Sequence, residues 1–123
     1  MLVRALTHSS YANANGTEHN ERLEFLGDSV LDLIAAEFLM IQHPPEREGF
    51  MSHRRAEMVR TCALAQRARD LGLNDEILVV GDYLRSVGSV LADCMEAVVG
   101  ALYLDSNDIN EVRRLALEWG ILK

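Results

Sequence analysis

In this 123-residue chain, the residues best suited to metal binding are acidic side chains that recur at helical spacing. Glu21, Glu24 and Asp28 are three and four residues apart, which places them within an arc of about 60° on one helix face. Asp93 and Glu96 are also three residues apart, in a second apolar stretch. Because clustered carboxylates repel one another unless a cation lies among them, this pattern favours a metal site over a solvated acidic face.

Small residues accompany both acidic groups, namely Gly27 in the first and Ala92, Ala97 and Gly100 in the second. Small side chains let two helix backbones approach closely, so we expect the two acidic faces to meet. Oxygen ligands without cysteine select Mg²⁺ or Mn²⁺, and the absence of Glu-x-x-His argues against a di-iron bundle. A magnesium pair suits hydrolysis of a phosphodiester or a pyrophosphate. Asp32, one turn beyond Asp28, either supports the metal ligands from outside or is only a surface residue, and we favour the surface position.

The hydrophobic periodicity predicts an all-α protein with one domain over residues 1–123. The broad apolar surface of residues 21–42 is typical of a central helix with several neighbours. The expected helices are Glu21–Gln42, Met51–Leu71 with a break near Thr61, Val90–Leu104, and Asp108–Trp119.

Local signals predict where these helices end. Asn20 and Ser52 are expected to cap helix N-termini, and Gly72 has the position of a C-terminal glycine. Residues 11–19 and 81–89 are expected to be loops, and residues 73–80 a short helix or an extended connector.

The overall charge is unfavourable for the simplest kind of nucleic-acid binder. Twelve Lys and Arg residues against 19 Asp and Glu give a net charge of −7, whereas such binders neutralise phosphates with basic residues. No apolar run is long enough to span a membrane. Cys62 and Cys94 are expected to be buried thiols, which fits the cytoplasm or an organelle matrix.

Residues 20–31 (NERLEFLGDSVL) closely resemble the signature of the ribonuclease III family. Two further blocks agree in order and spacing. They are residues 6–11 (LTHSSY), and residues 91–97 (LADCMEA) with 100–105 (GALYLD). The resemblance extends along nearly the whole chain and implies a compact helical endonuclease domain.

The resemblance implies a homodimeric endonuclease that uses Mg²⁺, or Mn²⁺ as a substitute, to cut double-stranded RNA into 5′-phosphate and 3′-hydroxyl ends. It assigns the metal to Glu24, Asp28, Asp93 and Glu96, with Asp28, Glu96, Glu48 and Glu21 as catalytic residues. Glu48 corresponds to a residue outside the metal shell that shapes the cutting site across the dimer. Six of the 19 acids therefore belong to the expected sites, and RNA binding without metal is expected to be weak.

Other residues are expected to contact RNA or the partner subunit. Asn20 and Arg22 match the signature, while Arg54 and Arg55, with Arg60, form either a phosphate-facing edge or a solvated face. The resemblance makes Phe25 a residue that inserts into the partner. Without the resemblance, Phe25 could instead pack in the hydrophobic core of its own chain.

Two other functions remain open from the sequence. One is an all-α nucleotide pyrophosphohydrolase, which also uses carboxylates on helices around Mg²⁺. The other is a non-catalytic double-stranded-RNA-binding or ribosome-associated relative. The bacterial enzymes carry a C-terminal double-stranded-RNA-binding domain, which these 123 residues lack. His8 is expected to be a hydrogen-bonded structural residue of the first helix, and Trp119 to pack the last helix.

Overall fold

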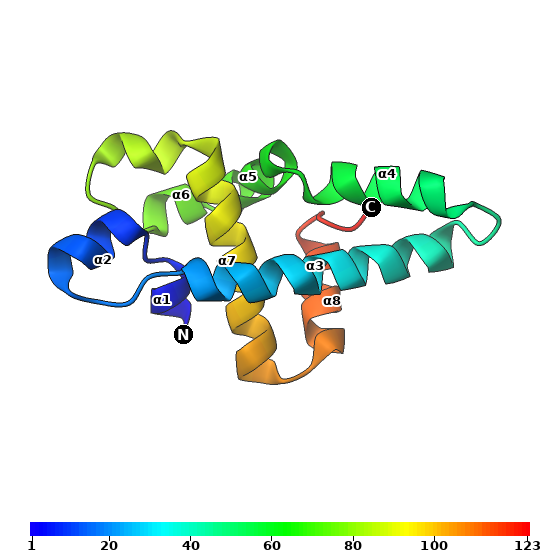
Figure 1. The fold of residues 1–123 in the computed structure, drawn as a ribbon, viewed down its shortest axis with the longest axis horizontal. Helices are drawn as coiled ribbons and strands as arrows, with labels where there is room; N and C mark the ends of the chain where they lie inside the picture. The colour runs from blue at the N-terminus through cyan, green and yellow to red at the C-terminus, as the bar shows by residue number, and fades with distance from the viewer.

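The computed structural model describes all residues 1–123 and consists of helices with one isolated β-bridge (Figure 1). The elements in chain order are α1 (Leu2–Ala5), α2 (Ser9–Asn15), α3 (Glu21–Gln42), α4 (Glu48–Val59), α5 (Thr61–Asp70), α6 (Leu73–Glu76), the 3₁₀ helix η1 (Asp82–Ser86), α7 (Gly88–Ser106) and α8 (Ile109–Glu118). The prediction of an all-α chain is confirmed. None of the helices combines the length and the apolar character that crossing a bilayer requires.

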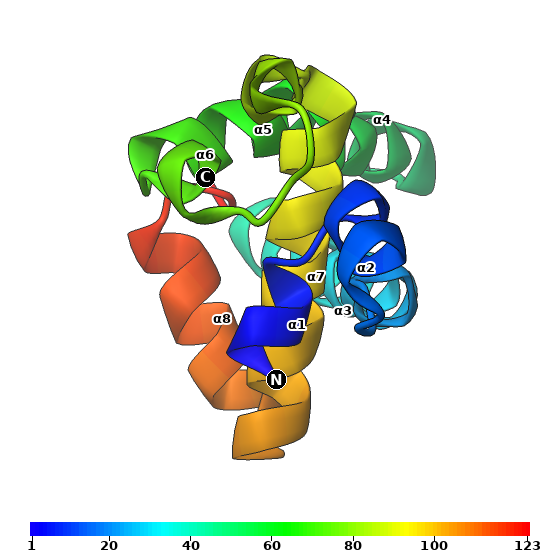
Figure 2. The same cartoon turned by 90° about the vertical axis from the view of Figure 1, so that its left-hand side faces the viewer.

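Helices α3 and α7 cross at the centre of the molecule, and the other helices are arranged around this pair (Figures 1 and 2). A Cβ atom added to Gly27 of α3 would lie 1.7 Å from the carbonyl oxygen of Glu96 on α7. One added to Gly100 of α7 would lie 2.2 Å from the carbonyl oxygen of Leu23 on α3. The two backbones therefore touch where both helices carry glycine, and the expectation of a close approach is confirmed.

The hydrophobic core surrounds α7, of which nine residues between Leu91 and Ala101 are buried. Leu31, Ile34 and Leu39 of α3 reach it from one side, and Leu64 of α5 from another. Trp119 is partly buried against the same core, as predicted. Helix α7 is enclosed on most sides. Asp93 and Glu96 are the only acidic residues in its central part.

The predicted helix bounds hold best where the sequence carries strong signals. Helix α3 has the expected bounds, and Gly72 follows α5 with a left-handed φ of 75°. The expected break lies at Arg60, whose extended backbone separates α4 from α5. The N-cap prediction for Ser52 is wrong, because this residue lies inside α4 and its hydroxyl donates a hydrogen bond to Glu48 Oε1 (2.6 Å).

Asn20 immediately precedes α3 but does not cap it with its side chain, so that prediction is also wrong. Its backbone is already helical, and its buried amide donates a hydrogen bond to the carbonyl of Ala5 (3.2 Å). His19 Nδ1 accepts the Glu21 N–H instead (3.3 Å). Asn20 therefore ties the start of α3 to α1.

Two predicted loops contain helical structure. The polar segment before α3 forms α2, whose N-cap is His8 and whose C-cap is Gly16 with a left-handed φ of 66°. Residues 82–86 form a 3₁₀ turn. Residues 73–80 are a short helix and a connector, as predicted, and the connector pairs with Thr7 through a parallel bridge at Leu78.

The two cysteines have different environments, so the prediction that both are buried is wrong for one of them. Cys94 is buried in α7, whereas Cys62 is exposed in the first turn of α5.

We predict that Gly27→Ala destabilises the fold by about 3 kcal/mol or more, because the new methyl group would overlap the Glu96 carbonyl and force α3 away from α7. Urea unfolding monitored by circular dichroism measures the change. Gly49→Ala in α4 is the matched control, since its added Cβ meets nothing within 4 Å, and it should stay within about 1 kcal/mol of the parent. Equal stability of the two variants would show that the backbone contact does not constrain the fold.

Candidate metal centre

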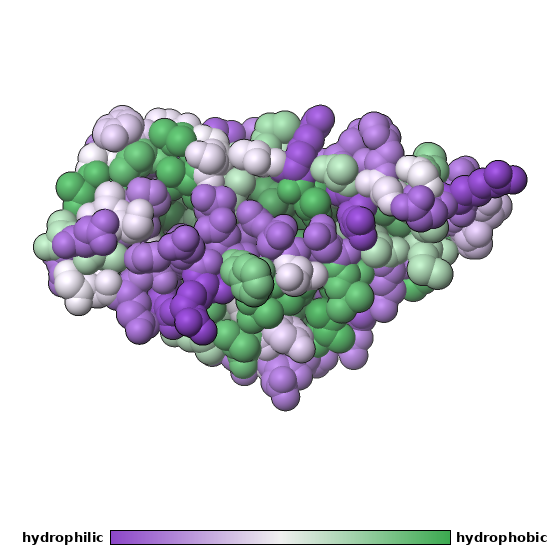
Figure 3. All heavy atoms as spheres, in the orientation of Figure 1, coloured by the Kyte–Doolittle hydropathy of each residue, from purple (hydrophilic) through white to green (hydrophobic).

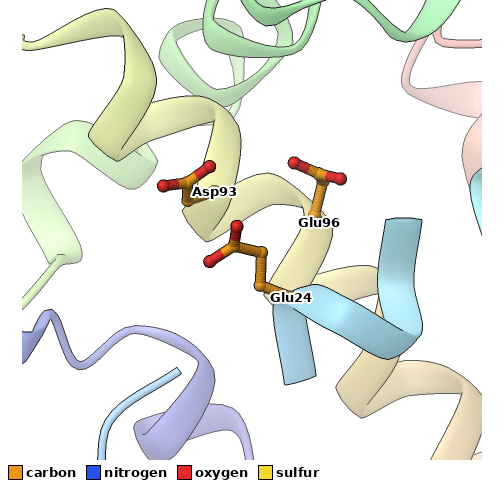
Figure 4. A group of neighbouring side chains, drawn as sticks. All are labelled: Glu24, Asp93 and Glu96. Atoms are coloured by element: carbon orange, nitrogen blue, oxygen red, sulfur yellow. The ribbon is translucent and has the colours of Figure 1, made fainter. Parts of the chain in front are cut away.

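The crossing of α3 and α7 brings three carboxylates together, with Glu24 from α3 and Asp93 and Glu96 from α7 (Figure 4). One oxygen of each lies within 4.8 Å of the others, and all three side chains are half-buried. Glu24 stands three residues before Gly27, and Glu96 four residues before Gly100. Each carboxylate is therefore one helical turn from its glycine on the same face, and the backbone contact holds the acidic turns against each other.

Burial and mutual repulsion raise the pKa values of these carboxyl groups. Burial, followed by the charge of Asp93 and a hydrogen bond with it, raises the pKa of Glu24 to about 7. Burial, followed by a hydrogen bond with Asp28 and its charge, raises the pKa of Glu96 to about 8. Burial also raises the pKa of Asp93, against the opposing effects of Glu24 and His8. Without a cation, the cluster therefore retains protons at pH values where ordinary carboxylates have lost them.

The cluster fits a hard divalent cation. Its three donors are carboxylate oxygens, which Mg²⁺ and Mn²⁺ prefer. The neighbouring thiol of Cys94 is not among these donors, because it is buried in the hydrophobic core. A bound cation would displace the protons that Glu24 and Glu96 retain and would compensate the repulsion among them.

Two other predicted site residues lie at the margins of the cluster. Asp28 is exposed on α3 and lies close enough to raise the pKa of Glu96. Glu21 is exposed, lies close enough to raise the pKa of Glu24, and has its Oε2 3.8 Å from His19 Nε2. Asp32, predicted to be a surface residue, is half-buried, and burial followed by the charge of Asp28 raises its pKa.

Glu48 is not part of the cluster within one chain. It begins α4 and lines a hollow of about 200 Å³ with Ala36 and Met40, near the far end of α3. Ala36 is 12 residues beyond Glu24, which corresponds to about 18 Å along the helix.

The residues predicted to contact RNA are spread over several surfaces. Asn20 is buried, while Arg22 is exposed beside Phe25. Arg54 lines a hollow with Arg60, whereas Arg55 lines a different one with Glu48. Arg55 is therefore not grouped with Arg54 and Arg60 in one hollow, and contact of the three with RNA stays a prediction.

Two histidines without ligand spacing in the sequence lie beside the cluster. His8 and His19 line a polar hollow of about 290 Å³ together with Glu21, Glu24 and Asp93. His8 Nδ1 accepts the Ser10 N–H (3.1 Å), which confirms a hydrogen-bonded structural residue, although it caps α2 rather than lying inside a helix. Spacing does not reveal this arrangement, because the segments on either side of α2 bring the two imidazoles together.

Phe25, which follows Glu24 directly, is 78% exposed. The alternative that it belongs to the chain's own core is therefore wrong. It lines a hollow of about 710 Å³ with Leu26 and Leu104. Figure 3 shows apolar side chains gathered on the face of the molecule below α3.

The amino-acid sequence is similar to one family of known proteins over nearly its whole length. The sequence pattern of the Ribonuclease-III-like family matches residues 1–119. Ribonuclease 3 of Photobacterium profundum is 46% identical over 123 residues, which cover 97% of this chain and 53% of that protein. Ribonuclease 3 of Oleidesulfovibrio alaskensis is 49% identical over 112 residues, covering 85% and 48%. The chain thus spans about half the length of these curated relatives.

A solved structure agrees closely with the fold. The nuclease domain of ribonuclease III from Campylobacter jejuni, described with a flexible region involved in dimer formation, superposes with a TM-score of 0.89 at 36% identity. The match covers 96% of this chain and 82% of that one.

We predict that the metal-free protein loses stability as the pH rises from about 5 to 8. Over this range the folded chain holds protons on Glu24 and Glu96 that the unfolded chain has released, so a higher pH favours unfolding. Thermal unfolding in EDTA measures the trend, and added Mg²⁺ should raise the melting temperature most at the alkaline end. Glu96→Gln should flatten the trend, and Glu46→Gln in an exposed loop should preserve it. Stability that increases over this range would contradict the prediction.

Proposed function

We propose that this chain, which belongs to the Ribonuclease-III-like family, is the endonuclease domain of a Mg²⁺-dependent enzyme that hydrolyses double-stranded RNA. Mn²⁺ is the substitute cation in this proposal. The observation that supports this most directly is the convergence of Glu24, Asp93 and Glu96 at the α3–α7 crossing. The products are strands with 5′-phosphate and 3′-hydroxyl ends.

In this proposal Glu24, Asp28, Asp93 and Glu96 hold the cation. Bound Mg²⁺ supplies Lewis-acid polarisation of a phosphoryl oxygen and neutralises developing negative charge. The chain's own contribution is to fix the four carboxylates on two rigid helices, so that little reorganisation accompanies binding. The polar hollow that Glu24 and Asp93 line gives a phosphate group access to these two carboxylates.

The remaining site residues have supporting roles in the proposal. Glu21 extends the acidic surface at the mouth of this hollow. Asn20 acts by positioning, because its amide anchors the start of α3 to Ala5. Arg22, Arg54 and Arg55 supply cationic contacts for the RNA backbone from separate surfaces.

The net charge of −7 is compatible with an RNA substrate under this proposal. Five of the 19 acids lie at or beside the proposed cation site, and a bound divalent cation would reverse the local sign. RNA binding should therefore depend strongly on divalent metal and on salt.

We further propose that the protein acts as a homodimer. A two-fold axis gives two equivalent sites, one for each strand of a duplex. The exposed Phe25 and the adjacent hollow provide a self-complementary contact, and Glu48, remote from its own cluster, would act at the site across the dimer. The Campylobacter jejuni relative is described with a region involved in dimer formation. The free thiols of Cys62 and Cys94 fit a cytoplasmic location.

We predict that Glu96→Gln, and likewise Asp28→Asn, lowers Mg²⁺-dependent cleavage of a hairpin RNA by at least about a hundredfold, the size expected for loss of one group that stabilises developing charge. RNA binding measured by gel shift in Ca²⁺ should persist, and Glu46→Gln should cleave like the parent.

The same cleavage assay separates the other two functions. Release of pyrophosphate from nucleoside triphosphates without RNA cleavage would favour a pyrophosphohydrolase. A parent protein that binds the hairpin but leaves it intact in both Mg²⁺ and Mn²⁺ would favour a non-catalytic relative.

We predict that Phe25→Ala weakens the dimer by at least about tenfold in Kd, because a large exposed aromatic ring is a typical interface anchor. Sedimentation equilibrium at low micromolar concentration measures the monomer–dimer constant. Tyr83→Ala, at a ring that is 71% exposed elsewhere on the surface, is the matched control. An unchanged dimer constant in Phe25→Ala would exclude this residue from the interface.

A further inference from the structure

A second hollow, bounded by α4, α5 and the residues after α8, has a charge opposite to that of the metal centre. Its volume is about 330 Å³, and its basic side chains are Arg54, Arg60, Arg67 and Lys123. Glu57 is its only acid. Four of the chain's 12 basic residues therefore line one hollow in a protein whose net charge is −7. We call this hollow the arginine pocket.

Two of the guanidinium groups are fixed by part of their hydrogen-bonding capacity. Arg67 is half-buried, with its Nε 3.5 Å from Asp70 Oδ2. Arg67 Nη1 packs closely against Gly120, since a Cβ atom added to this glycine would lie 3.0 Å from it. Arg54 Nη2 donates a hydrogen bond to the carbonyl of Lys123 (3.0 Å). Arg54 Nη1 also lies 3.9 Å from Glu57 Oε2. Each of the two guanidinium groups is therefore held beside one carboxylate, and the remaining N–H donors of both face the pocket without a partner in the chain.

The third guanidinium, that of Arg60, makes no ion pair or side-chain hydrogen bond within the chain. Its residue lies at the junction of α4 and α5, where α5 begins without a side-chain cap and without an acidic residue in its first turn. The guanidinium of Arg60 and the N-terminus of α5 thus both favour an anion as the ligand.

The pocket also has an apolar wall. Met58 and Ile121 line it and are almost fully buried, with 5% and 2% exposure. The volume is at the lower end of the range for small-molecule sites. Because these two side chains expose so little surface, the basic side chains determine the ligand, and a compact, multiply charged anion matches them.

We infer that the arginine pocket binds the terminal phosphate of a phosphomonoester, either a free nucleotide or the 5′-phosphorylated end of a nucleic-acid strand. Planar guanidinium forks pair with two phosphate oxygens at once. A terminal phosphate is a dianion near neutral pH and attracts three arginines more strongly than the single charge of an internal phosphodiester. The site is built from residues outside the metal centre, so binding there requires neither a divalent cation nor cleavage.

The exposed Cys62 provides a reporter, because it lines the pocket whereas Cys94 is buried. The rate at which N-ethylmaleimide modifies Cys62 is measured by mass spectrometry, with EDTA present to leave the acidic cluster without metal. Adenosine 5′-monophosphate at concentrations up to about 10 mM, well above the ~1 mM Kd of a weak ligand, should slow the modification. Adenosine should not slow it. A short oligonucleotide with a 5′-phosphate should protect better than the same strand with a 5′-hydroxyl.

Substitutions then assign the protection to the pocket. Arg60→Gln changes an exposed side chain without partners and should weaken protection about tenfold, the value of one charge-assisted contact. Arg60→Gln/Arg67→Gln should abolish it. Arg69→Gln, on the exposed side of α5, removes the same charge outside the pocket and should have little effect. Each rate is divided by the ligand-free rate of the same variant.

The outcomes separate the two ligand sources and test the inference itself. Protection by the phosphorylated strand alone identifies a strand end as the ligand, and protection by the nucleotide identifies a free phosphomonoester as sufficient. Protection by neither ligand would overturn the inference. Protection that survives Arg60→Gln/Arg67→Gln, or that Arg69→Gln removes equally, would overturn it as well. Because no RNA is cleaved in EDTA, these results do not depend on the proposed nuclease activity.

Discussion

The backbone contact between α3 and α7 is the constraint on which the rest of this structure depends. At Gly27 and Gly100 each helix packs against a carbonyl group of the other, and no Cβ atom fits between them. Helices packed through larger side chains are 8–10 Å apart, which would separate the residues one turn away. The close contact instead brings Glu24 within a few ångströms of Asp93 and Glu96. Two glycines thereby position a group of carboxylates.

This arrangement is unfavourable for the protein without a cation. Half-buried carboxyl groups at such short distances are protonated well above their ordinary pKa, as Glu24 and Glu96 are. The surrounding core of α7 limits their access to water, and the exposed Asp28 adds negative charge at the margin. Repulsion of this kind destabilises the empty fold but prepares a site in which a cation gains interactions with all the carboxylates at once. Binding and folding stability are therefore coupled at the same residues.

The net charge conceals a separation of charge across the molecule. A group of three carboxylates lies at the α3–α7 crossing, while Arg54, Arg60 and Arg67 line one hollow between α4, α5 and the residues after α8. Glu57 and Asp70 pair with Arg54 and Arg67 and hold them in place, whereas Arg60 has no acidic partner. Because local fields depend on the nearest groups, an acidic protein can present one region suited to cations and another suited to phosphates.

The helical class, the bounds of α3 and the acidic faces could be predicted from the residues alone, because helical periodicity fixes which side chains share a face. The residues also indicated the close approach at Gly27. The hydrogen bond from Asn20 to Ala5 in place of a cap on α3, and the exposure of Phe25, depend on how the segments pack together and could not be predicted in this way. The same holds for His8 and His19 beside the carboxylates and for the grouping of Arg54 with Arg60 apart from Arg55. These features join residues from different segments, and periodicity within one helix carries no information about which neighbour its faces will meet.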